Sequence, residues 1–362
     1  MTTGVYRKQE QEPASDEVTE VAPGVLRLML PIQLPGLGHV NCYAIEDSRG
    51  FSLIDPGLPG DEPWRALRER LRTAAIPLRR VHTSVVTHSH PDHFGASDQL
   101  REEAGAEILT HETFSDIFAR INDDLDVDLL ELDEDAMVEL WKQRYQSQGP
   151  TDWGTDREPP PDEAIRRWIS MGHDGGPRRF RAPDPTIRVA HEQVVSLGDR
   201  DWLAVHTPGH TTDHLCLWDP TGGALLAGDH VLPTITPHIA GSTELDDPLA
   251  SFFDSLDLVG SLDGVSIVLP AHGHPFSDLK GRTQVIRRHH EERLDLLRGA
   301  AGALLDGPVE AWMRVLFSER AWGYMAASET YAHLEHLKVA GEATARRDQD
   351  GLLRYTITEG DT

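Results

Sequence analysis

The chain contains very few cysteines. Its 362 residues include two, Cys42 and Cys216. Two cysteines cannot form the dense disulfide framework of a small secreted scaffold. Both stand in apolar, strand-like runs, residues 40–43 and 215–217, so we expect two buried core thiols and no catalytic cysteine.

Long apolar runs are also missing. No segment approaches the ~20 apolar residues that a membrane-spanning helix needs. Residues 1–20 are polar and lack the apolar centre of a signal peptide, and we expect them to form a flexible N-terminus. The sequence therefore predicts a cytoplasmic protein with no membrane partner. The Gly-x-Ser-x-Gly motif that presents a serine nucleophile is absent as well.

Basic residues are scarce relative to acidic ones. The chain has 34 Lys and Arg against 60 Asp and Glu, for a net charge of −26. An acidic surface repels phosphate backbones unless a local basic patch overrides it, which disfavours a nucleic-acid partner. Apolar residues make up 39% of the chain, enough to bury the core of one large domain and a smaller one.

Short strand-like runs alternate with helical patterns along much of the sequence. Residues 64–73 have helical spacing, with Trp64, Leu67 and Leu71 on one face. This alternation predicts a layered α/β fold, in which loops at strand ends carry the chemistry. We expect strands at residues 25–30, 42–45, 51–54, 81–86, 186–197, 202–205, 215–218, 224–227 and 265–269.

Residues 112–190 interrupt this rhythm. The stretch 122–139 is rich in Asp and Glu and has no basic residue, but its leucines still allow a helix with an apolar stripe. A second helical piece covers residues 165–171. We expect a mostly helical insertion or lid, because long excursions from a compact domain are usually functional. A solvated surface insertion is the alternative.

The C-terminal part is mainly helical. Helical patterns at residues 284–305, 309–317 and 328–340 precede a hairpin pattern at 343–357. Three helices and a hairpin predict a small winged-helix-like domain over residues 281–362, after a catalytic domain over residues 21–280.

The strongest signal for function is the run Thr87-His88-Ser89-His90-Pro91-Asp92-His93, directly after an apolar strand. Four candidate metal ligands fall within six residues, and imidazole with carboxylate is a donor set that suits zinc. A single histidine is usually structural, but four such residues in this order at a strand end indicate a metal site.

Three later candidates repeat the same pattern of strand, tight turn and ligand. His210 follows a strand and a Pro-Gly turn, Asp229 follows Gly228, and His272 follows Pro270-Ala271. Small residues and prolines beside each one suit a tight turn close to an ion. This repetition points to one shared metal centre.

The order His-x-His-x-Asp-His, Gly-His-Thr, Gly-Asp-His and a late His resembles the metallo-β-lactamase superfamily over residues 21–280. It is most similar to the glyoxalase-II-like group, and the C-terminal helices resemble a winged-helix-like module of one branch. The resemblance implies an α/β fold, the αββα sandwich of that superfamily, with the helical insertion and the C-terminal domain added. That branch contains small-molecule hydrolases and an endoribonuclease.

The resemblance also implies a division of ligands. It assigns His88, His90 and His210 to a first zinc, and Asp92, His93 and His272 to a second, with Asp229 bridging them. Asp55 matches a buried aspartate that orients the ligand loop. His90 stands where di-iron relatives carry a glutamate, so two zinc ions are expected, with iron and manganese as alternatives.

This chemistry predicts a dinuclear zinc hydrolase that uses a metal-bridging hydroxide to cleave a small acyl substrate, a thioester, lactone or other ester. Asp92 is the catalytic candidate, as both ligand and base. One alternative is a metal-dependent endoribonuclease or phosphodiesterase whose C-terminal module grips RNA. Another is a DNA-binding regulator with a vestigial site. The oligomeric state stays open, with a homodimer as one option.

The remaining histidines are expected to have structural roles. His230 and His274 neighbour predicted ligands and should hydrogen-bond their turns, while His206 should support its strand end. We expect the histidines of the C-terminal helices to be solvated or to pack; they are His289, His290, His333 and His336.

Overall fold

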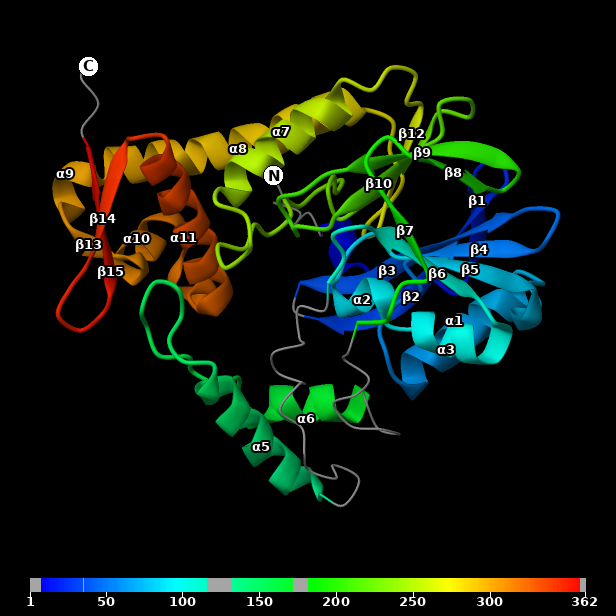
Figure 1. The fold of residues 1–362 in the computed structure, drawn as a ribbon, viewed down its shortest axis with the longest axis horizontal. Coiled ribbons are helices and arrows are strands. Elements are labelled where there is room, and N and C mark those ends of the chain that lie inside the picture. The colour runs from blue at the N-terminus through cyan, green and yellow to red at the C-terminus, as the bar shows by residue number, and fades with distance from the viewer. Residues whose placement is uncertain (1–7, 35, 116–131, 172–181, 359–362) are drawn as a thin grey trace, which may run out of the picture.

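The computed structural model describes residues 8–34, 36–115, 132–171 and 182–358 (Figure 1). A seven-stranded sheet has the order β1-β2-β3-β4-β5-β6-β7, and a five-stranded sheet has the order β12-β11-β10-β9-β8. The first comprises β1 (Val18–Ala22), β2 (Val25–Leu34), β3 (Leu37–Glu46), β4 (Phe51–Ile54), β5 (Val81–Val85), β6 (Glu107–His111) and β7 (Ile187–Val189). The second comprises β8 (Val194–Leu197), β9 (Arg200–His206), β10 (Leu215–Trp218), β11 (Ala224–Gly228) and β12 (Ile267–Pro270).

The central strand β3 shows how the sequence builds two layers. Successive side chains of a strand point to opposite faces. Cys42 and Ala44 pack with the helices on the outer face, whereas Tyr43 and Ile45 pack against the second sheet. Because both faces are buried, four apolar residues follow one another at positions 42–45 instead of alternating with polar ones.

Helices cover the outer face of each sheet. On the first sheet lie α1 (Asp61–Thr73), α2 (Pro91–Phe94) and α3 (Ser97–Ala104), and α1 buries Trp64, Leu67 and Leu71 as predicted. On the second lie α7 (Pro248–Gly260) and α8 (Leu279–Gly299), packed through Phe252 and Leu256. The αββα sandwich is therefore confirmed (Figure 1). Among the described residues, no helix has both the length and the apolarity that crossing a bilayer requires.

Both cysteines lie in the core, as expected. Cys42 and Cys216 are fully buried and free. Burial raises the pKa of the Cys216 thiol to about 12 and raises that of Cys42 further. Neither forms a reactive thiolate near neutral pH.

One expected strand, residues 186–197, is wrong in its connection. The structure divides it into β7, which pairs with β6, and β8, which pairs with β9 in the other sheet. A turn separates them, in which Gln193 N–H donates to the Ala190 carbonyl (3.2 Å) and Glu192 adopts a φ of 64°. Both strands face the same core, and the polar residues His191, Glu192 and Gln193 between them are exposed at the turn.

The described part of the insertion contains two helices, α5 (Glu134–Ser147), capped by the Asp133 carboxylate, and α6 (Asp162–Met171). Its last residues belong to the sandwich instead, because β7 lies within the expected range 112–190. The two helices pack through Val138, Ile165 and Ile169. Most of the acidic stretch predicted as a helix, including Leu125 and Leu129, lies outside the described residues.

The segment after α5 joins the insertion to the C-terminal part. The Trp153 indole N–H donates to Glu310 (2.9 Å), and its ring lies 5.6 Å from the rings of Tyr324 and Tyr331. Trp153 is therefore a packing residue that joins the insertion to the C-terminal part. Phe114 is likewise buried in a small core cluster with Val86.

The C-terminal elements follow α8 without a break in the apolar core. They are α9 (Ala301–Leu304), β13 (Gly307–Pro308), α10 (Val309–Leu316), α11 (Tyr324–Val339), β14 (Ala343–Arg347) and β15 (Leu353–Ile357). The expected hairpin is present, and β13 joins it in the order β13-β15-β14. One apolar cluster runs from Val268 in β12 through Phe252 to Trp312 and Leu334. The winged-helix interpretation and the boundary at residue 280 stay predictions.

Candidate metal centre

Four loops at strand ends bring the predicted ligands to one edge of the sandwich. The loop after β5 carries His88, His90, Asp92 and His93, and α2 begins within it at Pro91. The other three loops follow β9, β11 and β12 and supply His210, Asp229 and His272. Six of the seven side chains are buried, and His90 is partly exposed.

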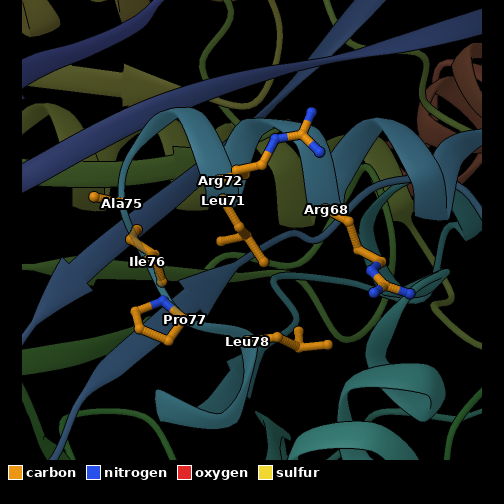
Figure 2. Close-up of a pocket in the computed structure, with 7 residues that line it drawn as sticks. All are labelled: Arg68, Leu71, Arg72, Ala75, Ile76, Pro77 and Leu78. Carbon is orange, nitrogen blue, oxygen red and sulfur yellow. The ribbon is translucent and has the colours of Figure 1, made fainter.

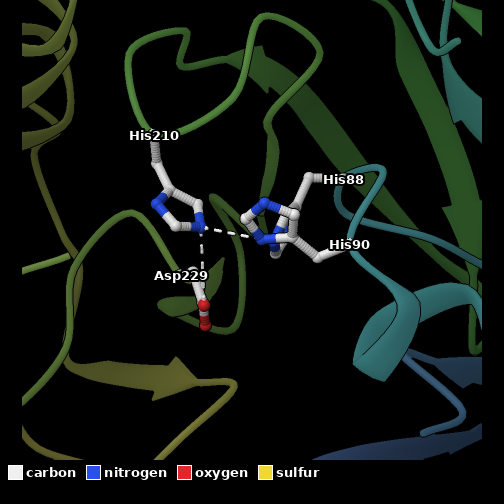
Figure 3. Close-up of side chains that lie close together, drawn as sticks. All are labelled: His88, His90, His210 and Asp229. Carbon is white, nitrogen blue, oxygen red and sulfur yellow. Dashed lines mark hydrogen bonds and ion pairs between the residues drawn. The ribbon is translucent and has the colours of Figure 1, made fainter. Parts of the chain in front are cut away.

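The first group consists of His88, His90, His210 and Asp229, whose donor atoms lie within 4.8 Å of one another. His90 Nδ1 lies 2.9 Å from His88 Nε2 and 3.2 Å from His210 Nε2. Asp229 Oδ2 lies 3.6 Å from His210 Nε2. Figure 3 shows the side chains converging, with His88 and His90 on one loop and His210 and Asp229 on two others.

The second group consists of Asp92, His93 and His272 and satisfies the same 4.8 Å limit. Asp92 Oδ2 lies 3.4 Å from His272 Nε2 and 3.6 Å from His93 Nε2. Asp229 also reaches this group, because its Oδ1 lies 3.3 Å from His272 Nε2. The members of each set implied by the resemblance thus lie close together, and Asp229 lies near both sets. Their role as metal ligands stays a prediction.

These spacings fit metal coordination. Two donors about 2.1 Å from a tetrahedral ion are about 3.4 Å apart, close to the separations within each group. Buried polar atoms normally have hydrogen-bond partners. Within the described residues, however, His93 Nε2, His272 Nε2 and Asp229 Oδ1 form no hydrogen bond of normal geometry. A bound cation would satisfy these atoms together.

Hydrogen bonds on the far side of the rings fix which nitrogen faces the centre. His272 Nδ1–H donates to the His39 carbonyl (2.6 Å), and His210 Nδ1–H donates to the His238 carbonyl (2.7 Å). Each bond leaves the Nε2 lone pair of that ring free for a cation. Such outer contacts orient metal-binding histidines and strengthen them as ligands.

Asp55 organises the loop after β5, as the sequence predicted. It is buried and adopts a φ of 54°, a left-handed conformation that Asp tolerates better than most residues. Its carboxylate accepts bonds from the Thr87 N–H (2.9 Å), the Thr87 hydroxyl (2.8 Å) and His93 Nδ1–H (3.0 Å).

The two groups differ electrostatically. Burial, reinforced by neighbouring histidines, lowers the pKa of His88 well below its usual value and that of His90 to about 3. Burial also tends to lower the pKa of His272, but the Asp229 and Asp92 carboxylates outweigh this effect and raise the pKa to about 10. Burial opposes ionisation of Asp92, yet His93 and His272 lower its pKa to about 2. Neutral imidazoles and ionised carboxylates are the forms that bind metals.

Sequence reasoning missed several residues that support this centre. His214 is fully buried; its Nε2 accepts the Asp229 N–H (3.0 Å), and its Nδ1 lies 2.8 Å from the Thr207 hydroxyl. Gly228 is required beside it, because a Cβ there would lie 2.7 Å from His214 Nε2. His214 directly precedes β10, so a search for polar residues at both ends of each strand would have found it.

Asp213 and Ser89 connect two ligand loops. The Ser89 hydroxyl, between His88 and His90, donates to Asp213 Oδ1 (3.1 Å). Burial raises the pKa of Asp213 to about 6. This contact fixes the loop after β5 to the loop that carries His210.

The other histidines near the ligands have supporting positions. His230 is buried beside Phe252, with ring centroids 5.2 Å apart. His274 contacts Arg27 (3.1 Å) and Glu12 (2.9 Å). His206 stacks on His111 with centroids 3.8 Å apart, and its Nε2–H donates to the Thr212 carbonyl (2.8 Å).

A separate surface hollow lies beside the C-terminal end of α1 (Figure 2). Arg68, Arg72 and apolar side chains such as Leu71 and Leu78 line it. None of the seven candidate ligands belongs to its lining, and it holds no pair of groups suited to hydrolysis. This hollow is therefore separate from the candidate metal centre.

Comparisons with known proteins agree with this geometry. Residues 35–272 match the metallo-beta-lactamase superfamily. The probable metallo-hydrolase YqjP of Bacillus subtilis is 25% identical over 285 residues, covering 73% of this chain and 81% of that protein. The lactamase-like protein vrtG of Penicillium aethiopicum is 27% identical over 301 residues, covering 82% and 72%.

Solved structures extend the similarity beyond the sandwich. A metallo-beta-lactamase family protein from Thermus thermophilus has a TM-score of 0.70 and 26% identity, covering 93% of this chain and 100% of that one. A beta-lactamase domain protein from Burkholderia ambifaria has the same TM-score and identity, covering 96% and 95%. The match to the superfamily spans well over half of the sequence. The chain therefore belongs to the metallo-beta-lactamase superfamily and is a metal-dependent hydrolase.

Proposed function

We propose that the protein is a dinuclear zinc hydrolase of small acyl substrates such as thioesters, lactones or other esters. The observation that carries the proposal is the pair of buried donor groups that share the Asp229 carboxylate. His88, His90 and His210 would hold the first ion, and Asp92, His93 and His272 the second. The imidazole-rich donor set favours zinc, with iron and manganese as alternatives.

When bound, the ions would provide a nucleophilic water at neutral pH and polarise the scissile carbonyl. The protein's own residues hold the donors in place. Asp55 fixes the loop after β5, His214 fixes the backbone of Asp229, and the His39 carbonyl fixes the ring of His272. Asp92 lies beside both His93 and His272, where it can act as a ligand and accept a proton.

The charges favour a small substrate over RNA. The net charge of −26 opposes polyanions. The arginines that an RNA-gripping C-terminal module would use already have partners. Arg346 pairs with Asp306, and Arg347 donates to the carbonyls of Gly351 and Asp152, both at 2.8 Å. We therefore rank the endoribonuclease alternative below the acyl hydrolase.

We also propose that the insertion, residues 112–190, caps the site and selects the acyl group. The Thr113 hydroxyl donates to the Thr212 carbonyl (3.4 Å) on the His210 loop, which places the start of the insertion beside the ligands. Farther along, Trp141 and Trp168 pack edge to face with centroids 6.3 Å apart. These two rings and Tyr145 remain the aromatic candidates for a pocket wall.

A substrate screen tests the proposal. Zinc-loaded protein is incubated with acyl-thioesters, lactones, simple esters and phosphodiesters, beside metal-free protein as a control. We expect metal-dependent cleavage of at least one acyl class at rates well above any phosphodiester. Cleavage of RNA or phosphodiesters alone would replace the acyl proposal with the nuclease alternative.

A further inference from the structure

The backbone that orients the His210 ring lies in the stretch between β11 and α7, residues 229–247. The carbonyl of His238 in this stretch accepts the His210 Nδ1–H bond at 2.7 Å. That bond orients the ring and leaves Nε2 for the centre. The position of the His238 backbone therefore decides where His210 Nε2 points.

The C-terminal helix α11 holds this stretch from outside the sandwich. His238 Nδ1 lies 3.3 Å from Glu329 Oε2, and the Gly241 N–H donates to the Ser328 hydroxyl (3.1 Å). Glu329 and Ser328 are adjacent on α11, and both are buried. The neighbourhood of His238 is thus fixed to a helix that lies about 90 residues later in the sequence.

Glu329 is itself rigidly held. Its Oε1 pairs with the Arg293 guanidinium of α8. Its backbone carbonyl accepts from His333 Nδ1–H (2.7 Å). Burial opposes ionisation of Glu329, but His238 and Arg293 outweigh it and lower its pKa to about 2, so the carboxylate is charged. A buried, paired carboxylate makes a firm anchor for the His238 ring.

His290, Glu329 and His333 are also close enough together to hold a metal ion, but their contacts favour a supporting role. Arg293 already neutralises the carboxylate. Because His333 Nδ1–H donates to a carbonyl, His333 Nε2 accepts a hydrogen bond from His290 Nδ1–H, 3.2 Å away. The Glu329 charge and the His333 Nε2 lone pair are therefore both engaged without a cation.

We propose that Glu329 is a positioning residue for the metal centre, acting through His238 on His210 across the junction of the sandwich and the C-terminal helices. The inference rests on the proposed role of His210 as a metal ligand. It gives the C-terminal part a function in assembling the site: without α11, the acceptor for His210 would lose its outer support. The expected consequence is selective, since only the ion held by His210 depends on this chain of contacts.

The test compares two histidines that form the same kind of bond. His238 pairs with Glu329, with side chains 22% and 11% exposed, and His336 pairs with Asp247 (2.9 Å), with side chains 20% and 11% exposed. Both pairs connect α11 to the same stretch, but only His238 carries the carbonyl that His210 uses. The variants are His238→Ala and the matched control His336→Ala, with His238→Asn restoring an N–H donor.

Metal-free full-length variants are titrated with Zn²⁺ against a chromophoric chelator, and with Co²⁺ to record visible absorption. We expect His238→Ala to weaken one of the two binding steps by about tenfold or more, as the loss of an outer contact commonly does. The visible absorption of the Co²⁺ ion bound in the weakened step should also change, and the other binding step should keep its affinity. His238→Asn should recover part of the loss, while His336→Ala should lower the unfolding temperature without changing either step.

Wild-type affinities in His238→Ala would overturn the inference, as would an equal loss in His336→Ala. If His238→Ala does not fold, Glu329→Gln tests the same contact from α11, and unchanged binding in that variant has the same consequence. A wild-type protein that takes up no metal would instead contradict the proposed function itself, so the two failures are distinguishable.

Discussion

The carboxylate of Asp229 lies between His210 and His272. Its Oδ2 is 3.6 Å from His210 Nε2, and its Oδ1 is 3.3 Å from His272 Nε2. The two histidines come from loops 62 residues apart in sequence, after β9 and after β12. His272 and His93 also hold the pKa of Asp229 well below its usual range against the opposing effect of burial. A permanently ionised group with one oxygen toward each set is suited to bridging two cations.

Replacing Asp229 tests the bridge directly. Asp229→Ala should lose metal and nearly all hydrolytic activity while staying folded, because its contacts are local to the site. We expect metal affinity to fall by at least about a hundredfold, beyond what the loss of an outer contact costs. Elemental analysis measures the metal content, circular dichroism the folding, and turnover the hydrolytic activity.

Asp201→Asn is the control, since Asp201 is exposed at the far end of β9, where its carboxylate accepts from the Ser196 hydroxyl (3.1 Å). Wild-type turnover in Asp229→Ala would show that the bridging assignment is wrong.

Asp55 should act on the metals without touching them. In Asp55→Asn the new residue also tolerates the positive φ, but the negative charge that accepts hydrogen bonds from Thr87 and His93 is lost. We expect metal affinity to fall by about 10- to 100-fold, measured by chelator competition.

Asp47→Asn is the matched control for Asp55→Asn. Asp47 is also a buried turn aspartate, but it caps the β3–β4 turn through the N–H groups of Arg49 (2.8 Å) and Gly50 (3.0 Å). That variant should lose stability and keep its metal affinity. An equal loss of affinity in both variants would mean that general loosening, rather than the orientation of His93, explains the effect.

The candidate ligands could be identified from the sequence because the pattern around each one is local. An apolar strand, a turn of small residues and a histidine or aspartate can be read from six to ten neighbouring positions, as at His88 or Asp229. Reading the starts of strands as well as their ends would have added His214 as a candidate but not its role, and His238 could not be found from the local sequence. Their roles depend on contacts with Asp229 and His210 that exist only after the strands are ordered in the sheet.

The same limit explains the errors outside the site. Residues 186–197 contain two apolar runs separated by the exposed residues His191, Glu192 and Gln193. Only the pairing of β7 with β6 and of β8 with β9 shows that the chain changes sheet at this turn. The sequence around Trp153 does not reveal its packing partners either, because Glu310 and Tyr331 lie more than 150 residues later. The periodicity of the sequence identifies which residues are buried. Only the tertiary structure shows which other residues they pack against.

Metal content gives a third prediction. Protein expressed in zinc-supplemented medium should contain close to two metal ions per chain, mainly zinc, by elemental analysis. Removing them with a chelator should lower the unfolding temperature, because ions bind only the folded ligand set. A thousandfold excess of free ion over Kd contributes about 4 kcal/mol to stability. Zn²⁺ added back should restore the original unfolding temperature. Protein without any transition metal under these conditions would contradict the proposed cofactor.

The last prediction concerns the insertion. If α5 and α6 form a cap over the site, Trp141→Ala and Tyr145→Ala should change substrate choice and leave metal content intact. Trp141 packs against Trp168 at the junction of the two helices, so its loss should reshape the wall rather than unfold the domain. We expect selectivity between short and long acyl chains to shift by about tenfold or more, which is about 1.4 kcal/mol in transition-state binding. Trp322→Ala is the control, since this 41% exposed indole lies on the C-terminal part beside Arg314. Ratios of kcat/KM across a substrate panel measure the effect. Ratios equal to those of the wild type in both Trp141→Ala and Trp322→Ala would show that the insertion does not select the substrate. The residues of the ligand loops would then determine selectivity.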